Sequence, residues 1–264
     1  MDGIDSELRR SGWIRHFEHF PVTDSTNLAA KRWLTSETSV KTPGLFVADQ
    51  QTAGRGRGGH QWWSPDGCLM MTLVIAHDSM PTNVDDWGQL ALIVGLSIAE
   101  AAQSLLEDRA SVQLKWPNDV FLQGKKCGGI LIESHADQYW LVGIGTNVQV
   151  DLNAAPEEVA SRAISLHQHM PPSSAADARA VFLLEALNRL ESNLTQWKTG
   201  QFDWRTPWSE LCLLTGRIIS VSVPGPGKKS VLQGRCEGVD AQGRLILRSS
   251  EQVHLLSSAE IRAW

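Results

Sequence analysis

The sequence predicts an α+β protein: a mixed or antiparallel sheet with flanking helices, followed by a small C-terminal β-barrel of the SH3 type. Short apolar runs with tight connections between residues 45 and 148 are typical of neighbouring strands in such a sheet. Residues 87–107 repeat apolar side chains at the spacing of a helix. From Gly216 onward, short alternating segments are separated by Pro/Gly turns. We expect a larger domain over residues 1–208 and a smaller one over 209–264.

Composition excludes several classes of protein. The 264 residues suffice for both domains, and the net charge of −5 argues against a general affinity for nucleic acid, which depends on neutralising phosphates. Four widely spaced cysteines form no C-x-x-C pair, so we expect buried thiols in a reducing compartment. The first ten residues contain no apolar signal region, and no run reaches the ~20 apolar residues of a membrane span. We therefore expect a cytoplasmic protein without membrane contact.

A loop rich in glycine and arginine separates the expected strands 45–48 and 69–75. Four of its glycines fall within residues 54–59 and allow close approach to a ligand, while Arg55 and Arg57 add two permanent charges. Guanidinium groups bind phosphate or carboxylate oxygens with two parallel hydrogen bonds. The residues alone leave open a solvated turn or a nucleic-acid contact of the RGG kind. We interpret the segment as a loop that wraps an anion.

Two further polar clusters occur at the ends of expected elements. Asp24, Ser25 or Thr26 can each cap a helix that follows, and the same helix start offers free N–H groups to a ligand. Pro117 ends the strand before it and leaves Asn118 and Asp119 at the edge. The strands expected at 126–133 and 139–148 contain glycines, which let another group approach their backbone.

The remaining segments are interpreted as structural or variable. The helix at 87–107 presents one apolar face, which should pack on the sheet. Residues 151–172 are irregular and polar, as functional or mobile loops often are. Residues 178–197 repeat apolar side chains as an amphipathic helix does.

Five ordered motifs together resemble the biotin–protein ligases. They are Ser25-Thr26-Asn27, Gln51-Thr52-Ala53-Gly54-Arg55-Gly56-Arg57, Lys115-Trp116-Pro117-Asn118-Asp119, Lys126-Cys127-Gly128-Gly129-Ile130-Leu131 and Gly145-Thr146-Asn147. The resemblance covers the larger domain and, more weakly, the barrel. It implies the biotin/lipoate ligase catalytic fold over residues 1–208. Only residues 1–22 precede the first motif, so the form without an N-terminal DNA-binding domain is expected.

The resemblance implies an enzyme that makes biotinyl-5′-AMP from biotin and ATP with Mg²⁺, then transfers biotin to one lysine of a biotin carboxyl carrier protein. It assigns catalysis to Lys126, Arg55 and Arg57, and Mg²⁺ contact to Asn118 and Asp119. Substrate contacts are expected from Ser25, Thr26, Asn27, Gln51, Gly54, Arg55, Gly56, Arg57, Trp62, Lys115, Asn118, Lys126, Gly129, Gly145 and Asn147. Gly58 stands where relatives often carry a basic residue, so loop closure is expected to differ here.

The chemistry agrees with this set of residues. A carboxylate that attacks a triphosphate brings two anions together, so the catalyst needs cations and positioning more than a nucleophile. A lipoate or octanoate ligase or transferase is the alternative within the same fold. A nucleic-acid-binding module that uses Arg55 and Arg57 is the alternative of another class, although DNA binding is not expected. A homodimer remains open.

Overall fold

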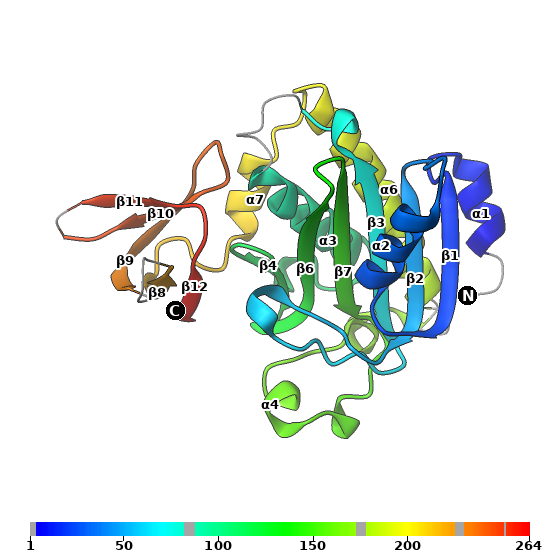
Figure 1. Cartoon of the computed structure of the whole chain (residues 1–264). Helices are drawn as coiled ribbons and strands as arrows, with labels where there is room; N and C mark the ends of the chain where they lie inside the picture. Colours follow the sequence, from blue (N-terminus) through cyan, green and yellow to red (C-terminus); the bar gives the residue numbers. More distant parts are fainter. Residues whose placement is uncertain (1–3, 82–87, 173–177, 225–229, 251) are drawn as a thin grey trace.

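The computed structural model describes residues 4–81, 88–172, 178–224, 230–250 and 252–264. They form two sheets with helices on both faces of the larger one (Figure 1). No helix in these ranges is long and apolar enough to cross a membrane.

The larger sheet is mixed, as predicted, and has the strand order β1-β2-β3-β7-β6-β5-β4. Only β1 and β2 pair in parallel, and every other neighbouring pair is antiparallel. The strands are β1 (His16–Thr23), β2 (Gly44–Gln51), β3 (Cys68–Ala76), β4 (Val112–Lys115), β5 (Asp119–Leu122), β6 (Lys125–His135) and β7 (Tyr139–Asn147). Strand β1 was not predicted, because its residues lie at the sheet edge and are mostly half-buried or exposed.

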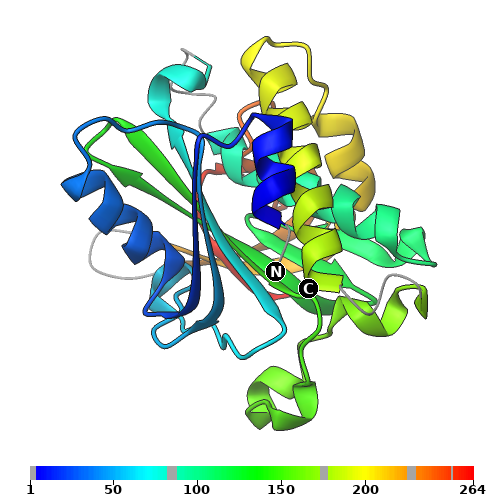
Figure 2. The ribbon, with the colours of Figure 1, turned by 90° about the vertical axis from the view of Figure 1, so that its right-hand side faces the viewer.

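Helices cover the two faces of this sheet unequally (Figure 2). Helix α2 packs on β2, β3 and β7, whereas α3 packs on β4, β5 and β6 and is covered in turn by α6. The helices are α1 (Ile4–Ser11), α2 (Thr26–Ser36), α3 (Leu90–Leu105), α4 (Glu157–Ala160), α6 (Ala178–Lys198) and α7 (Arg205–Leu211). Segment 151–172, expected to be irregular, contains α4 and the short 3₁₀ turns Leu152–Ala154 and Leu166–His169.

Helix α3 corrects one expectation. Its interpretation as a helix with a single apolar face is wrong, because Leu92, Ile93 and Leu96 are buried together with Leu90 and Val94. The reason is its position between the sheet and α6, which buries every residue from Leu92 to Ala99, whereas Ser104 near its end is exposed. Burial on every side favours apolar residues around the helix. Residues 82–87, the expected first turn, lie outside the described residues.

The C-terminal barrel is five-stranded and antiparallel, in agreement with the SH3-type prediction, and its strand order is β11-β10-β9-β8-β12. Its strands are β8 (Ile218–Val223), β9 (Ser230–Val239), β10 (Leu245–Arg248), β11 (Val253–Leu256) and β12 (Glu260–Ala263). Strands β11 and β12 were not predicted. The boundary between residues 208 and 209 falls inside α7, which contacts both β4 and β9, and it stays a prediction.

Tryptophans join the barrel to the larger domain. The indole N–H of Trp116 donates to the carbonyl of Gly243 in the β9–β10 turn at 3.0 Å. The side-chain amide of Gln89 donates to the carbonyl of Ala241 at 2.9 Å, and its oxygen accepts from Trp197 and Trp204. Trp116 directly follows Lys115, so this junction also fixes the edge of the candidate site.

The cysteines are free and unequal. Cys68, Cys127 and Cys236 are buried, but Cys212 is half-buried, which corrects the expectation of four buried thiols. Burial raises the pKa of Cys68 and of Cys127 to about 12. A hydrogen bond with Cys236 lowers the pKa of Cys212, against the effect of burial.

Candidate active site

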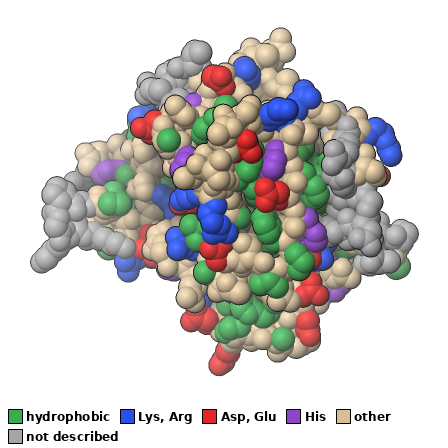
Figure 3. Space-filling model, turned by 45° about the vertical axis from the view of Figure 1, so that its right-hand side comes forward, with side chains coloured by type: hydrophobic (Ala, Val, Ile, Leu, Met, Phe, Trp, Pro, Cys, Tyr) green, Lys and Arg blue, Asp and Glu red, His purple; other side chains and the backbone are tan. Residues whose placement is uncertain are grey.

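A cavity of about 810 Å³ opens between the glycine-arginine loop, the ends of β5, β6 and β7, and the barrel. Most of the residues proposed from the sequence line it: Ser25, Thr26, Asn27, Gln51, Arg55, Gly56, Arg57, Trp62, Lys115, Asn118, Asp119, Lys126, Gly129, Gly145 and Asn147. Gly54 does not line the cavity but lies at the base of the loop, where its carbonyl accepts from Trp62. Basic side chains gather beside acidic ones near the middle of the face in Figure 3.

The loop is a short hairpin. Arg55 and Gln61 form an antiparallel bridge, and the N–H of Gly56 donates to the carbonyl of His60 at 2.7 Å. The tip is the 3₁₀ turn Arg57–Gly59, in which Gly58 has φ +70°. This left-handed conformation gives a local reason for glycine at position 58.

Gly54 is needed for close approach and not for an unusual φ. A Cβ at this position would lie 2.6 Å from the carbonyl oxygen of Trp62 and 2.5 Å from the hydroxyl of Ser64. The carbonyl of Gly54 also accepts from the N–H of Trp62 at 3.0 Å. The base of the hairpin is therefore closed by contacts that only glycine permits.

The first end of the cavity is polar and lies at the start of α2. Ser25 is the N-cap residue, but its hydroxyl makes no capping bond, so the capping interpretation holds for its position only. The side-chain oxygen of Gln51 accepts instead from the N–H and the hydroxyl of Thr26, at 2.7 and 3.2 Å. This end therefore presents hydroxyl and amide groups with helix N–H donors behind them.

Asn27 is held from two sides. Its side-chain oxygen accepts from the hydroxyl of Thr72 at 2.6 Å, and its amide donates to Glu133 at 2.7 Å. Lys31 donates to the other oxygen of Glu133 at 2.7 Å. Burial raises the pKa of Glu133, but the hydrogen bonds from Lys31 and Asn27 outweigh it and hold the pKa below its ordinary value. Glu133 thus remains a charged anchor that fixes the orientation of the Asn27 amide.

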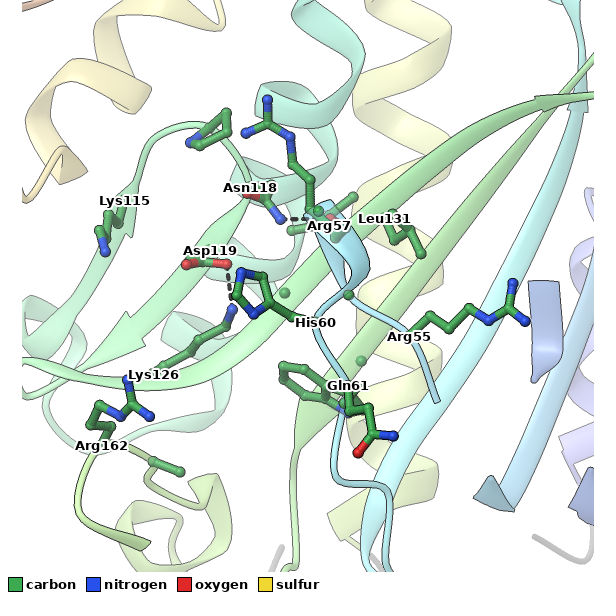
Figure 4. Close-up of a pocket in the computed structure, with 18 of the residues that line it drawn as sticks. Arg55, Arg57, His60, Gln61, Lys115, Asn118, Asp119, Lys126, Leu131 and Arg162 are labelled. Atoms are coloured by element: carbon green, nitrogen blue, oxygen red, sulfur yellow. Dashed lines mark hydrogen bonds and ion pairs between the residues drawn. The ribbon is translucent and has the colours of Figure 1, made fainter. Parts of the chain in front are cut away.

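The second end of the cavity contains ionic groups. The Lys126 ammonium donates to Asp119 at 2.5 Å, across the pairing of β5 with β6 (Figure 4). Asn118 is turned to the backbone, since its amide donates to the carbonyl of Ile130 at 2.8 Å. The two polar residues of the Lys115–Asp119 motif therefore differ: the Asn118 amide binds the backbone, and the Asp119 carboxylate pairs with Lys126.

Lys115 lies at the same end, under an aromatic side chain from the barrel. Its ammonium is 3.5 Å from the ring centre of Trp264 and 5.7 Å from that of Phe121. Burial lowers the pKa of Lys115 to about 8, although the charge of Asp119 opposes this effect. A contact of ammonium with an aromatic face stabilises the charged form.

Glycines on two central strands form the floor between the two ends. A Cβ at Gly145 would lie 2.8 Å from the indole of Trp62, and one at Gly129 would lie 3.4 Å from the same ring. Lys126 is 5.4 Å from the Trp62 ring centre. The indole of Trp62 therefore lies against these two strands beside Lys126, where it forms part of the cavity wall. Asn147 follows Gly145 on β7 and accepts from the thiol of Cys68 at 3.4 Å.

The two arginines of the loop diverge. In Figure 4, Arg55 points away from the Asp119–Lys126 pair, and its charge lowers the pKa of Glu133. Arg57 is half-buried at the loop tip and contacts the barrel, and its pKa is lowered by burial while the charge of Asp119 opposes the shift. The structure thus brings Arg57, Lys126 and Lys115 to the same end and leaves Arg55 apart.

Sequence reasoning missed lining residues from two parts of the chain, the barrel and segment 151–172. Ser258, Ala259 and Trp264 come from the barrel, and no local pattern connects them with the loop. Arg162 comes from segment 151–172; its carbonyl accepts from the N–H of Lys126 at 2.9 Å. The polarity of that segment was the available signal, and it identified the segment but not the residue.

Metal binding by the protein alone is limited. Within the described ranges, no group of three or more His, Cys, Asp or Glu side chains could hold a metal ion. Asp119 and the side-chain oxygen of Asn118 remain near the ionic end of the cavity. Mg²⁺ is usually bound through one or two carboxylates, waters and substrate phosphates. This donor set therefore fits an ion that arrives together with a triphosphate.

Comparison with known proteins defines the class. Residues 19–150 match the biotin/lipoate A/B protein ligase family. A biotin–[acetyl-CoA-carboxylase] ligase from Mycobacterium tuberculosis is 31% identical over 95% of this chain and 90% of its own length. One from Paracoccus denitrificans is 29% identical over 90% of this chain and 97% of its own. The biotin protein ligase from Aquifex aeolicus, solved with biotin and ATP, has a TM-score of 0.78 at 29% identity and covers 95% of this chain and 100% of its own.

The fold and the site define a ligase. The chain belongs to the biotin/lipoate A/B protein ligase family. The resemblance to biotin–protein ligases, inferred from five short motifs, is thereby confirmed.

Proposed function

We propose that the protein activates biotin with ATP and transfers it to a lysine of a carrier protein. In the first step, a carboxylate oxygen of biotin bonds to the α-phosphorus of ATP, and pyrophosphate leaves. In the second, the ε-amine of the carrier lysine attacks the carbonyl of biotinyl-5′-AMP. An amide forms, AMP leaves, and the amine loses a proton.

One observation carries this proposal: a single cavity connects the polar start of α2 with the cations around Asp119. Its volume of about 810 Å³ is within the range of ligand sites of a few hundred to about 1,000 Å³. Cations at one end lower the repulsion between a carboxylate and a polyphosphate. The polar end can bind a neutral head group by hydrogen bonds.

Each group of residues has a proposed part in this reaction. Ser25, Thr26 and Gln51 bind the biotin head group, with Asn27 oriented behind them. Lys126 leaves Asp119 for the carboxylate and the α-phosphate, and Arg57 and Lys115 neutralise the remaining phosphate charge. Trp62 lies against the ligands on the Gly129–Gly145 floor, and Asn147 lies on the adenine side. Arg55 acts nearer to Glu133, at the biotin end.

Mg²⁺ enters this proposal as part of the ATP complex. Asp119, with Asn118, would hold it, and the ion would neutralise phosphate charge. Lys126 forms an ion pair with Asp119, so in this proposal the arriving ion and phosphates exchange partners with that pair.

The proposed partner is a biotin carboxyl carrier protein or domain. The net charge of −5 argues against DNA as an additional partner. The alternative is lipoate or octanoate as the acid, within the same family.

A comparison of the three acids tests the proposal. The protein is incubated with ATP, Mg²⁺ and biotin, lipoate or octanoate, and pyrophosphate release is followed, then transfer to a purified carrier domain. We expect release and transfer with biotin only. Release with lipoate or octanoate but not with biotin would replace the proposed substrate.

A further inference from the structure

The turn between β11 and β12 of the barrel contacts the tip of the glycine-arginine loop. One terminal nitrogen of Arg57 donates to the hydroxyl of Ser258 at 2.6 Å, and the other to the carbonyl of Ala259 at 3.4 Å. The partners are about two hundred residues apart in the sequence. The side chain of Arg57 therefore connects the loop to the barrel.

The two hydrogen bonds of Arg57 to the barrel differ from the other hydrogen bonds of the loop. The bridge of Arg55 with Gln61 and the bond of Gly56 with His60 shape the hairpin internally. They do not attach its tip to another element. In the described part of the chain, hydrogen bonds from the tip residues 57–60 to other elements are the two made by Arg57. The position of the tip over the cavity thus depends on the barrel.

Two hydrogen bonds to the barrel hold the Arg57 guanidinium. Burial lowers the pKa of Arg57, and the charge of Asp119 opposes that effect. A guanidinium has five N–H donors in a rigid plane. Two donors engaged by the barrel leave others for an anion, and a side chain already held loses less entropy when it binds.

We propose that Ser258 is a positioning residue, which holds Arg57 and through it keeps the loop closed over the cavity. The barrel then helps to retain the acyl-adenylate until the carrier arrives. The retention part rests on the proposed function, whereas the attachment of the loop does not. Ser258 itself lies outside the reacting groups and acts through Arg57.

Trypsin measures the attachment without any substrate, because it cleaves after Arg55 and Arg57. The variant Ser258→Ala removes the acceptor. Ser257→Ala removes a neighbouring exposed hydroxyl as a matched control, and Ser258→Thr keeps the hydroxyl. We expect cleavage within the loop to accelerate about five- to tenfold in Ser258→Ala, the effect of one charge-assisted hydrogen bond at a partly exposed site. The two control variants should match the wild type.

Retention of the adenylate is the second measurement. Labelled biotinyl-5′-AMP is formed on the enzyme, and its escape into solution is followed after dilution. We expect escape from Ser258→Ala to be about fivefold faster than from the wild type, and escape from Ser257→Ala to match the wild type. Ser258→Thr should restore slow escape.

The outcomes separate the two proposals. Equal trypsin cleavage in the wild type and Ser258→Ala overturns the attachment. Faster cleavage with unchanged adenylate escape overturns the retention role. A wild type that forms no adenylate from any of the three acids overturns the proposed function, while the trypsin comparison still decides the attachment.

Discussion

Lys115 is a cation whose charge depends on its surroundings. Its burial lowers the pKa to about 8, and Trp264 from the barrel covers its ammonium. In the unfolded chain the same group titrates near 10.4. The side chain is therefore charged at neutral pH but loses its proton within the range of ordinary enzyme assays.

We predict that the KM for ATP rises as the pH increases from 8 to 9.5, because Lys115 loses the charge that faces the phosphates. Lys115→Arg keeps a charge throughout this range and should remove most of the pH dependence. Loss of stability cannot explain the change. Between pH 8 and about 10.4 the unfolded chain binds more protons at this group, so its contribution to stability increases with pH. A flat KM in the wild type would contradict a phosphate role for Lys115.

Lys126 has an adjacent lysine as a natural control. Lys125 is exposed, whereas Lys126 is half-buried and pairs with Asp119. We predict that Lys126→Ala lowers the rate of adenylate formation by about 10²–10³-fold, as removal of one preorganised charge does. Lys125→Ala should stay near the wild-type rate. Circular dichroism should show the same fold for both variants, and equal rates would show that the motif was assigned to the wrong lysine.

At the scale of elements, the site depends on glycines in two strands, because the side chains of Trp62 and Lys126 lie directly against the backbone there. Gly145 on β7 and Gly129 on β6 admit the indole of Trp62 and the stem of Lys126. The hairpin above them depends on Gly54 and Gly58 for different reasons, close approach and a left-handed φ. The glycines of the motifs are thus a steric requirement of the cavity.

We predict that Gly145→Ala displaces Trp62, because the new Cβ would lie 2.8 Å from the indole. Overpacking of this kind costs about 1–3 kcal/mol. Biotin affinity should fall, and the fluorescence change on ligand binding should decrease. Trp62→Phe identifies the part of the signal that belongs to Trp62 among the eleven tryptophans. An unchanged ligand-induced signal in Gly145→Ala would mean that the indole does not line the ligand.

At the scale of the molecule, hydrogen bonds join the larger domain to the β9–β10 turn of the barrel. Trp116 donates to Gly243 and Gln89 donates to Ala241 across the junction, and Trp197 and Trp204 donate to Gln89 from within the larger domain. This accounts for part of the unusual tryptophan content. It also means that the barrel is fixed beside the loop it contacts through Ser258.

We predict that Trp116→Phe destabilises the protein by about 1–3 kcal/mol, because the carbonyl of Gly243 loses its donor in a buried place. Trp33→Phe is the matched control, since the buried indole N–H of Trp33 has no hydrogen-bond partner in the described structure. Thermal unfolding should show the larger loss for Trp116→Phe. Equal losses would assign the effect to volume and not to the hydrogen bond.

The sequence by itself determined the elements whose signals are local. Glycine spacing, Pro117 and the alternating runs identified most strands and the loop, because turn geometry and side-chain periodicity act over a few residues. Lys126 was assigned by the resemblance of its motif. Strand β1 was not predicted, since an edge strand with mixed exposure has a weak alternation of apolar and polar residues.

Only the tertiary structure decided where the side chains of the two loop arginines lie and which residues they contact. Arg55 and Arg57 are two residues apart, yet one lies toward Glu133 and the other reaches Ser258. Likewise, Trp264 covers Lys115 from another strand of the barrel. These contacts join distant segments, and their existence depends on how two sheets pack. No local pattern encodes that packing, because it results from the burial of whole faces at once.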